Sequence, residues 1–373
     1  MAEALGYHAR KMPAQPLKIA IVANKSWECE PLVGVLLARD GRPSQLTRFR
    51  RGYDPAELPP EKDPATGKPP ELPPEADGLP VRGNLPIRNR LAFGVEPTGA
   101  DVEVWCIEDW MRKQRRKKSG DGNVVVSASS SSSFEKFTFA LPRIRERAFG
   151  GNPDIIIAFG TAGIPTPETL NGCVIVGSRV YVHDPWLDAP ADEIAEQVER
   201  YGPLLRDEIK DLVDKRIDSP GLYDGLFAAD ISFEARHSAE GRFIASPIAP
   251  AVPARILAGH GYAALGTINI CNYDDYIWAD EETLRLFETQ VKQREIGSME
   301  TTHGLIRLTW RQVPFLFVSG LTNRVPMFNA EASPRRYAQA FVAAHNAAAT
   351  VAQLVPELAR LHAEGKLIKR PSA

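Results

Sequence analysis

The sequence has few cysteines, and their spacing forms no framework. Only four occur in 373 residues, at Cys29, Cys106, Cys173 and Cys271, and none forms a CxxC pair. Disulfide and zinc frameworks need paired or closely spaced cysteines. We therefore expect no metal site. A few scattered thiols are typical of proteins in a reducing compartment, so a cytoplasmic location is expected.

Long apolar runs and an excess of charge are also missing. No stretch approaches the roughly 20 apolar residues of a membrane helix, and the first residues have no apolar core of signal-peptide length. A net charge of -2 creates no overall field for nucleic acid or anionic membranes. With 43% hydrophobic residues, the composition is that of a globular protein with a sizeable core.

Several common catalytic and cofactor motifs are absent. The chain contains no GxSxG, no HExxH, no P-loop and no GxGxxG. A serine hydrolase elbow, a zinc protease helix, a phosphate-cradling loop and a dinucleotide-binding turn all lack their usual signature. We therefore expect no resident cofactor.

Composition divides the chain into one domain and its appendages. We expect a disordered leader over 1–16, a domain over 17–363 and a tail over 364–373. The segment 52–86 carries ten prolines, which predicts an extended insertion outside the core. A basic and serine-rich loop is expected over 111–133.

The basic and serine-rich loop has two interpretations for each of its parts. The run MRKQRRKK is either a nucleic-acid patch or a solvated loop, and the lack of interleaved aromatic residues favours the loop. The tract SASSSSS is either a linker or a tight loop that holds an anion at a helix N-terminus, and its composition favours the linker.

Apolar, β-branched runs alternate with helical patterns along the chain. Strands are predicted over 18–23, 91–94, 101–107, 154–159, 173–182, 265–271 and 313–318, and helices over 134–149, 192–215, 281–292 and 334–363. This alternation predicts an α/β fold: a single three-layer domain whose central mixed, mostly parallel sheet is flanked by helices. The small residues 160–163 follow a buried strand, so we expect a turn there at the ligand-binding edge of the sheet.

Four segments in order carry a resemblance to a known family. They are KIAIVANKSWECEPL (18–32), DIIIAFGTAG (154–163), GSMETTHG (297–304) and VPFLFVSGLTNRV (313–325). In this order they resemble the nucleoside phosphorylase/nucleosidase superfamily, which includes purine nucleoside phosphorylases and methylthioadenosine nucleosidases. The resemblance covers 17–50 and 90–360 loosely. It implies the phosphorylase-like fold, a homo-oligomer, and cleavage of the N-glycosidic bond of a purine nucleoside or nucleotide.

The resemblance assigns roles to the residues that match the family's motifs. Met299 would pack on the sugar, and the Glu300 carboxylate would grip the ribose hydroxyls, because it can accept hydrogen bonds from both. The alternative for Glu300 is a helix-capping glutamate. Asn323, with Thr322 in TNRV, would contact the purine as negative charge builds on it. The alternative is a polar residue at a strand end.

Glu28 falls where the nucleosidases place the glutamate that positions the attacking water, and a shift of one or two residues would make it Glu30. A carboxylate beside the anomeric carbon activates water but repels phosphate. The alternative for either residue is a solvated loop acid.

Five further residues match contact positions of the family. Thr161, beside Gly160, would touch the nucleophile; its alternative is a turn residue. Tyr273 or Tyr276 would stack on the base, with Phe159 near enough to contribute; the alternative is an ordinary half-buried tyrosine. Outside this set, His303 is interpreted as a structural histidine.

Three functions remain open at this stage. Hydrolysis is slightly favoured by Glu28. Phosphorolysis, with phosphate as co-substrate, is the first alternative, because TNRV is similar to the TNKV of phosphorylases that act on 6-oxopurines. A catalytically weak nucleotide sensor is the second. In each case the expected partner is a small nucleoside or nucleotide, with neither nucleic acid nor membrane.

Overall fold

The structure is a computed structural model, and it describes part of the chain. The described residues are 15–39, 89–92, 99–111, 117–118, 124–125, 133–165, 168–184, 189–201, 205, 209–213, 215–222, 243–258, 263–267, 296–327, 331 and 336–368.

One large mixed sheet organises the described residues. Its strands are β1 (Leu17–Ala23), β2 (Asn89–Ala92), β3 (Gly99–Cys106), β6 (Ile155–Ile164), β7 (Val174–Gly177), β8 (Arg179–His183), β9 (Arg216–Asp218), β10 (Ile256–Ala258), β11 (Ala263–Thr267), β12 (Ile296–Glu300) and β13 (Phe315–Arg324). Most pairings are parallel, and β2, β7, β9 and β12 each make an antiparallel one. A separate short hairpin joins β4 (Lys117–Lys118) and β5 (Val124–Val125).

The helices flank the sheet. They are α1 (Ser26–Arg39), α3 (Ile107–Trp110), α4 (Ser133–Glu135), α5 (Leu141–Arg147), α6 (Ala191–Tyr201), α10 (His303–Thr309) and α12 (Arg336–Ala363). A π-helical turn over Lys136–Ala140 joins α4 to α5. Short 3₁₀ turns cover Ala148–Gly151, Lys210–Leu212 and Val325–Met327.

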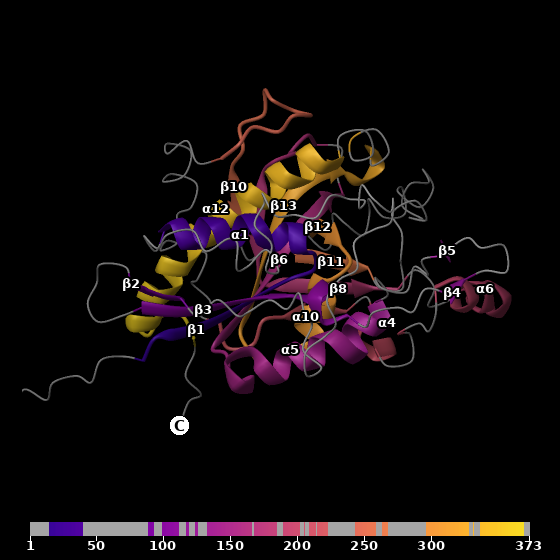
Figure 1. Ribbon diagram of the computed structural model, residues 1–373, viewed down its shortest axis with the longest axis horizontal. Coiled ribbons are helices and arrows are strands. Elements are labelled where there is room, and N and C mark those ends of the chain that lie inside the picture. The colour runs from indigo at the N-terminus through magenta and orange to yellow at the C-terminus, as the bar shows by residue number, and fades with distance from the viewer. Residues whose placement is uncertain are drawn as a thin grey trace, which may run out of the picture.

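Strand β1 explains the three-layer arrangement, because both of its faces are apolar. Ile19 and Ile21 join a core cluster with α1 and α12, whereas Ala20 and Val22 join a second cluster with α5 and α10. Figure 1 shows α1 and α12 on one side of the sheet and α5 and α10 on the other. A strand that is buried on both faces is the pattern of a parallel sheet between helical layers, and the predicted fold class is confirmed.

Strand β6 changes neighbours along its length. Its first half pairs with β1, from Ile19 opposite Ile155 to Ala23 opposite Phe159. Beyond the end of β1, β12 takes that side, with Met299 opposite Gly163. The other side pairs with β13 throughout. A ligand in an open α/β sheet binds where the neighbouring strands diverge, and here that place is the second half of β6.

Two sequence predictions about local structure are wrong. Residues 160–163 were expected to form a turn, but β6 continues through them to Ile164, because β13 supplies ladder partners as far as Arg324. A helix was expected over 192–215, but α6 ends at Tyr201, a 3₁₀ turn covers Lys210–Leu212 and β9 starts at Arg216.

Several predictions lie outside the described residues. These are residues 1–14 of the leader, the proline-rich insertion 52–86, most of the loop 111–133, the helix 281–292 and the tail beyond 368. Cys29, Cys106 and Cys173 are buried, and they form no disulfide within the described residues. Within the described part of the chain, no helix is both long and apolar enough to cross a membrane.

Candidate active site

Glu28 stands at the point where β1 ends. The chain leaves β1 at Ala23 and enters α1 at Ser26, so Glu28 lies in the first turn of that helix and not in a loop. Its side chain is only 4% exposed, which excludes the solvated loop acid considered above. A carboxylate in the first turn of a helix also meets the favourable end of the helix dipole.

Three hydrogen bonds hold the Glu28 carboxylate. Oε1 accepts from the backbone N–H and from the hydroxyl of Thr161, each at 2.9 Å, and Oε2 accepts from the Lys25 N–H at 2.9 Å. Burial raises the pKa of Glu28, although these hydrogen bonds and the charge of Lys25 oppose the shift. Gly160 leaves room for the carboxylate, since a Cβ there would lie 3.1 Å from Oε1.

Glu300 brings a second buried carboxylate from the end of β12. It is 7% exposed. Its oxygens accept the N–H groups of Thr302 and, at 2.7 Å, His303, so the capping interpretation is correct for this residue. A carboxylate has about four acceptor positions, so capping does not use up its capacity for a ligand.

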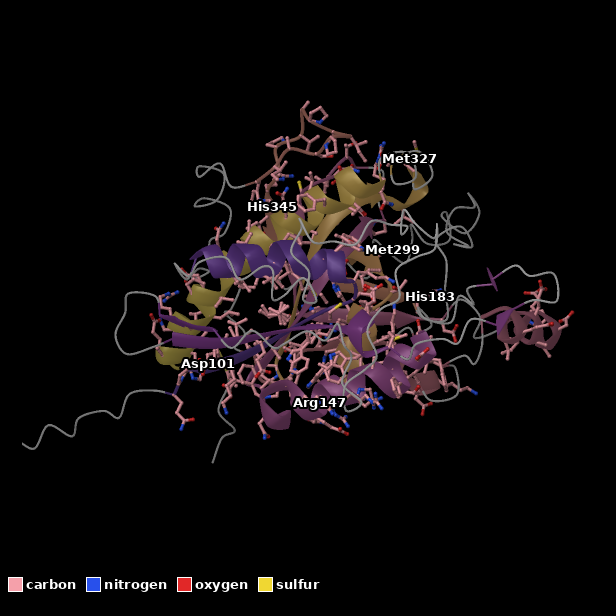
Figure 2. All side chains as sticks on the ribbon, in the orientation of Figure 1. Asp101, Arg147, His183, Met299, Met327 and His345 are labelled. Atoms are coloured by element: carbon pink, nitrogen blue, oxygen red, sulfur yellow. The ribbon has the colours of Figure 1, made fainter. Side chains whose placement is uncertain are left out.

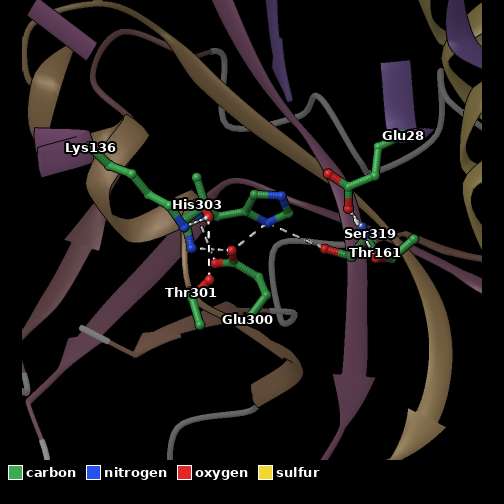
Figure 3. Close-up of polar contacts among 8 residues, drawn as sticks. Glu28, Lys136, Thr161, Glu300, Thr301, His303 and Ser319 are labelled. Atoms are coloured by element: carbon green, nitrogen blue, oxygen red, sulfur yellow. Dashed lines mark hydrogen bonds and ion pairs between the residues drawn. The ribbon is translucent and has the colours of Figure 1, made fainter. Parts of the chain in front are cut away.

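The charge of Glu28 acts on Glu300. Burial raises the pKa of Glu300 to about 8; the two N–H groups and the charge of Lys136 oppose the rise, while the negative charge of Glu28 adds to it. Two carboxyl groups that sense each other in a buried setting cannot both ionise easily. Figure 3 shows them on either side of His303 and Ser319.

Lys136 is a site residue that the sequence analysis missed. It lies in the π-helical turn after α4, is 3% exposed, and its Nζ is 3.5 Å from the Thr302 hydroxyl. Its side chain reaches the same corner as Glu300 (Figure 3). In the sequence, Lys136 follows a serine tract and lies in an apolar helical pattern, so its role was not recognised. In the structure it lies in a π-helical turn, a feature that is frequent at functional sites.

His303 lies beside Glu300 and Ser319. Its Nδ1 lies 3.4 Å from the Ser319 hydroxyl and 3.8 Å from Glu300 Oε1. Burial lowers the pKa of His303 to about 3, with a hydrogen bond to the backbone of Phe159 opposing the shift. The ring is therefore neutral near pH 7. Because one nitrogen meets both Ser319 and Glu300, this is not the relay of a serine hydrolase, which uses both ring nitrogens.

Asn323 approaches the second half of β6 from the opposite side to Glu300. It is 5% exposed and lies opposite Gly163 in the ladder. A Cβ on Gly163 would sit 2.9 Å from Val325 Cγ2 and 3.3 Å from Asn323 Nδ2, so a larger residue there would crowd both side chains. Nδ2 donates to the Arg324 carbonyl at 3.1 Å, and the Thr322 hydroxyl lies 2.6 Å from Oδ1.

The remaining predicted residues divide into two groups. Met299 is buried opposite Gly163, near the middle of the molecule (Figure 2). The Phe159 ring is 1% exposed and packs in the apolar cluster with α1 and α12. Tyr273, Tyr276 and the side chain of Glu30 lie outside the described residues.

The arrangement supplies acid–base groups rather than metal ligands. Within the part of the chain that the structure describes, no three histidine, cysteine or acidic side chains are grouped so that they could hold a metal ion. A fixed, buried carboxylate is suited to accepting a proton, because burial brings its pKa towards the working pH. An amide such as Asn323 offers both a donor and an acceptor to a heterocycle.

Comparison with known proteins gives loose structural likeness. No protein-family model and no curated protein match the chain. The 5′-methylthioadenosine/S-adenosylhomocysteine nucleosidase of S. pneumoniae is similar at 13% identity, over 92% of this chain and 100% of its own, with a TM-score of 0.42. Futalosine hydrolase of Helicobacter pylori is similar at 10% identity, over 91% and 98%, with a TM-score of 0.41. This likeness transfers neither a site nor a substrate.

Proposed function

We propose that the chain hydrolyses the N-glycosidic bond of a purine nucleoside or nucleotide and releases the free base. The observation that carries the proposal is the Glu28 carboxylate, which is buried, fixed by Thr161, and close enough to Glu300 for the two charges to interact. An ionised Glu28 beside the reacting centre favours neutral water over a phosphate anion as the nucleophile.

Each residue has a defined part in this reaction. Ionised Glu28 accepts a proton from the water that attacks the anomeric carbon. Glu300 accepts hydrogen bonds from the sugar hydroxyls, using acceptor positions that the two N–H groups leave. As the carbon–nitrogen bond breaks, its electron pair moves onto the purine, and Asn323 donates to the ring where the charge builds. The hydroxyl stays on the sugar, Glu28 gives its proton up to solvent, and the purine takes a proton from solvent, so the balance is one water consumed for free base and free sugar.

Phosphorolysis remains the second candidate, and Lys136 is the observation that favours it. Its buried ammonium group partly offsets the charge of Glu300, and a buried cation is what an anionic nucleophile needs. Under this alternative, phosphate replaces water and ribose 1-phosphate replaces free ribose as the product.

One panel assay decides between the candidates. The chain is incubated with purine nucleosides and nucleotides, with and without phosphate, and free base and sugar product are measured. We expect base and free ribose without phosphate. Turnover only with phosphate would establish phosphorolysis. A nucleoside that raises the melting temperature but is never cleaved would instead indicate a sensor.

The assembly is a separate proposal. The resemblance implies a homo-oligomer, and light scattering of the full chain tests it. A monomer at working concentration would contradict this part and leave the chemistry untouched.

A further inference from the structure

Glu331 is a buried acid whose hydrogen bonds lead to the residue after Asn323. The carboxylate is 4% exposed. Oε2 accepts the backbone N–H of Arg324 at 2.8 Å, and Oε1 accepts Nε of the same arginine at 2.6 Å. One carboxylate therefore holds both the main chain and the side chain of the residue that follows Asn323.

Asn171 extends the same network to the residue before Asn323. It is 1% exposed. Its Nδ2 donates to the Thr322 carbonyl at 2.9 Å and lies 3.1 Å from Glu331 Oε2. The backbone on both sides of Asn323 is thus tied, directly or through Asn171, to Glu331.

The backbone that this network holds is irregular. The register of β13 against β6 shifts between Leu321, which opposes Ala162, and Asn323, which opposes Gly163. Thr322 is therefore an extra residue in the strand. A bulge of this kind re-aims the next side chain and interrupts the ladder, so other groups must hold it. Asn171 bonds to Thr322, the extra residue, and Glu331 bonds to Arg324, the residue after Asn323.

The hydrogen bonds in this network are charge-assisted, because Glu331 is ionised and pairs with Arg324. Burial alone would raise the pKa of Glu331, but the hydrogen bonds from Arg324 and Asn171 together lower it below its usual range. The carboxylate stays ionised, and the Arg324 guanidinium pairs with it. Charge-assisted hydrogen bonds of this type are stronger than neutral ones and fix geometry.

We propose that Glu331 is a positioning residue that aims Asn323 at the purine ring. This inference rests on the proposed function, since it assumes that Asn323 meets the departing base. Glu331 does not contact substrate in this account. It acts by keeping the bulge at Thr322 in one shape, so that the amide next to Gly163 points in a fixed direction.

The test compares two substrates in the wild-type chain and in Glu331→Gln. A purine nucleoside needs a hydrogen bond to its leaving base, whereas p-nitrophenyl riboside releases a stable anion without one. We expect kcat for the nucleoside to fall about 10-fold to 100-fold and kcat for the nitrophenyl riboside to change by less than about threefold. An equal loss on both substrates would indicate a general structural role and overturn the inference.

A double-mutant cycle with Asn323→Ala gives an independent readout. If Glu331 acts through Asn323, then Glu331→Gln causes no further loss in the Asn323→Ala background. Multiplying losses would overturn the inference. The same cycle can be run on the affinity for free purine base. It therefore still tests the inference if the wild-type chain binds purine base but cleaves no nucleoside. That result would contradict only the proposed function. Wild-type chain that neither binds purine nor cleaves a nucleoside would overturn both.

Two further variants guard against misfolding. Asn171→Ala removes the bond to the Thr322 carbonyl and leaves the Arg324–Glu331 pair in place, so we expect the same substrate-selective loss, of smaller size. Glu357→Gln removes a carboxylate that pairs with Arg360 within α12, away from the bulge. It should leave both substrates unaffected.

Discussion

The two halves of β6 share one strand but differ in surroundings. Residues 155–159 lie between β1 and β13 and are fully or almost fully buried among apolar side chains. Residues 160–164 lie beside β13 and, at Gly163, β12; Glu28 bonds to Thr161 there, and Asn323 lies against Gly163. The apolar half contributes stability through burial. The polar half buries ionisable groups, which costs stability, and such a cost is typical of functional sites.

The largest expected effect in the polar half of β6 comes from replacing Glu28. We expect Glu28→Gln to reduce base release by about 1,000-fold, because the amide cannot accept the proton of the attacking water. Single-turnover assays measure this. Glu108→Gln, which removes an acid paired with Lys25 at 38% exposure, is the control and should be near wild type. A Glu28→Gln variant with full activity would place the base elsewhere.

The apolar half should respond in stability and not in chemistry. Ile157 is fully buried, so Ile157→Ala loses apolar contacts and leaves a cavity. We expect the free energy of unfolding to fall by about 2–5 kcal/mol in denaturant titrations, with little change in kcat. Val198→Ala, at an exposed position of α6, should change it by less than about 0.5 kcal/mol. A large loss of kcat in folded Ile157→Ala would contradict the claim that the apolar half of β6 affects stability and not chemistry.

The two remaining site residues should behave alike. We expect Glu300→Ala and Asn323→Ala each to reduce base release by at least about 100-fold, as for contacts made in the transition state. Glu357→Ala serves as the control for loss of an acid. Near-normal rates in both site variants would move the active site away from β6.

The smallest expected effect is a pH dependence of stability. The pKa of Glu300 rises from 4.5 to about 8 on folding, so the folded chain keeps a proton that the unfolded chain releases, and stability falls as pH rises through this range. His303, with its pKa lowered from 6.5 to about 3, acts with the opposite sign and only below pH 6.5.

Between pH 6.5 and 8, therefore, only Glu300 of these two changes charge state. We expect wild-type chain to lose about 1–2 kcal/mol of unfolding free energy more than Glu300→Gln across this window. Denaturant titrations at the two pH values measure the difference. Parallel losses in both chains would mean that Glu300 is ionised throughout.

Much of the sheet could be predicted because its signal is local. The run 18–23 is apolar on both faces, and the structure has β1 at Leu17–Ala23. The continuation of β6 through 160–163 could not be predicted, because glycine, threonine and alanine resemble a turn and the strand there depends on ladder bonds to β13. Strand pairing between segments that are distant in the chain cannot be read from the sequence of either segment alone.

The sequence motifs singled out the acidic residues of the candidate site but not the hydrogen bonds that hold them. Motif order led to Glu28, Glu300 and Asn323. The hydrogen bonds from Thr161 to Glu28 span residues 133 apart in the chain, and no periodicity reports such a contact. Lys136 and Glu331 were missed for the same reason, since each becomes informative only through its partners in space.

The most direct test of the account is a structure of Glu28→Gln with an uncleaved purine nucleoside bound. The account predicts the anomeric carbon beside residue 28, with one water between them that lies about 2.6–3.2 Å from the side chain of residue 28. It also predicts the sugar hydroxyls on Glu300 and the base on Asn323. A nucleoside bound away from the second half of β6, or with its base on Glu300 and its sugar on Asn323, would contradict the central claim.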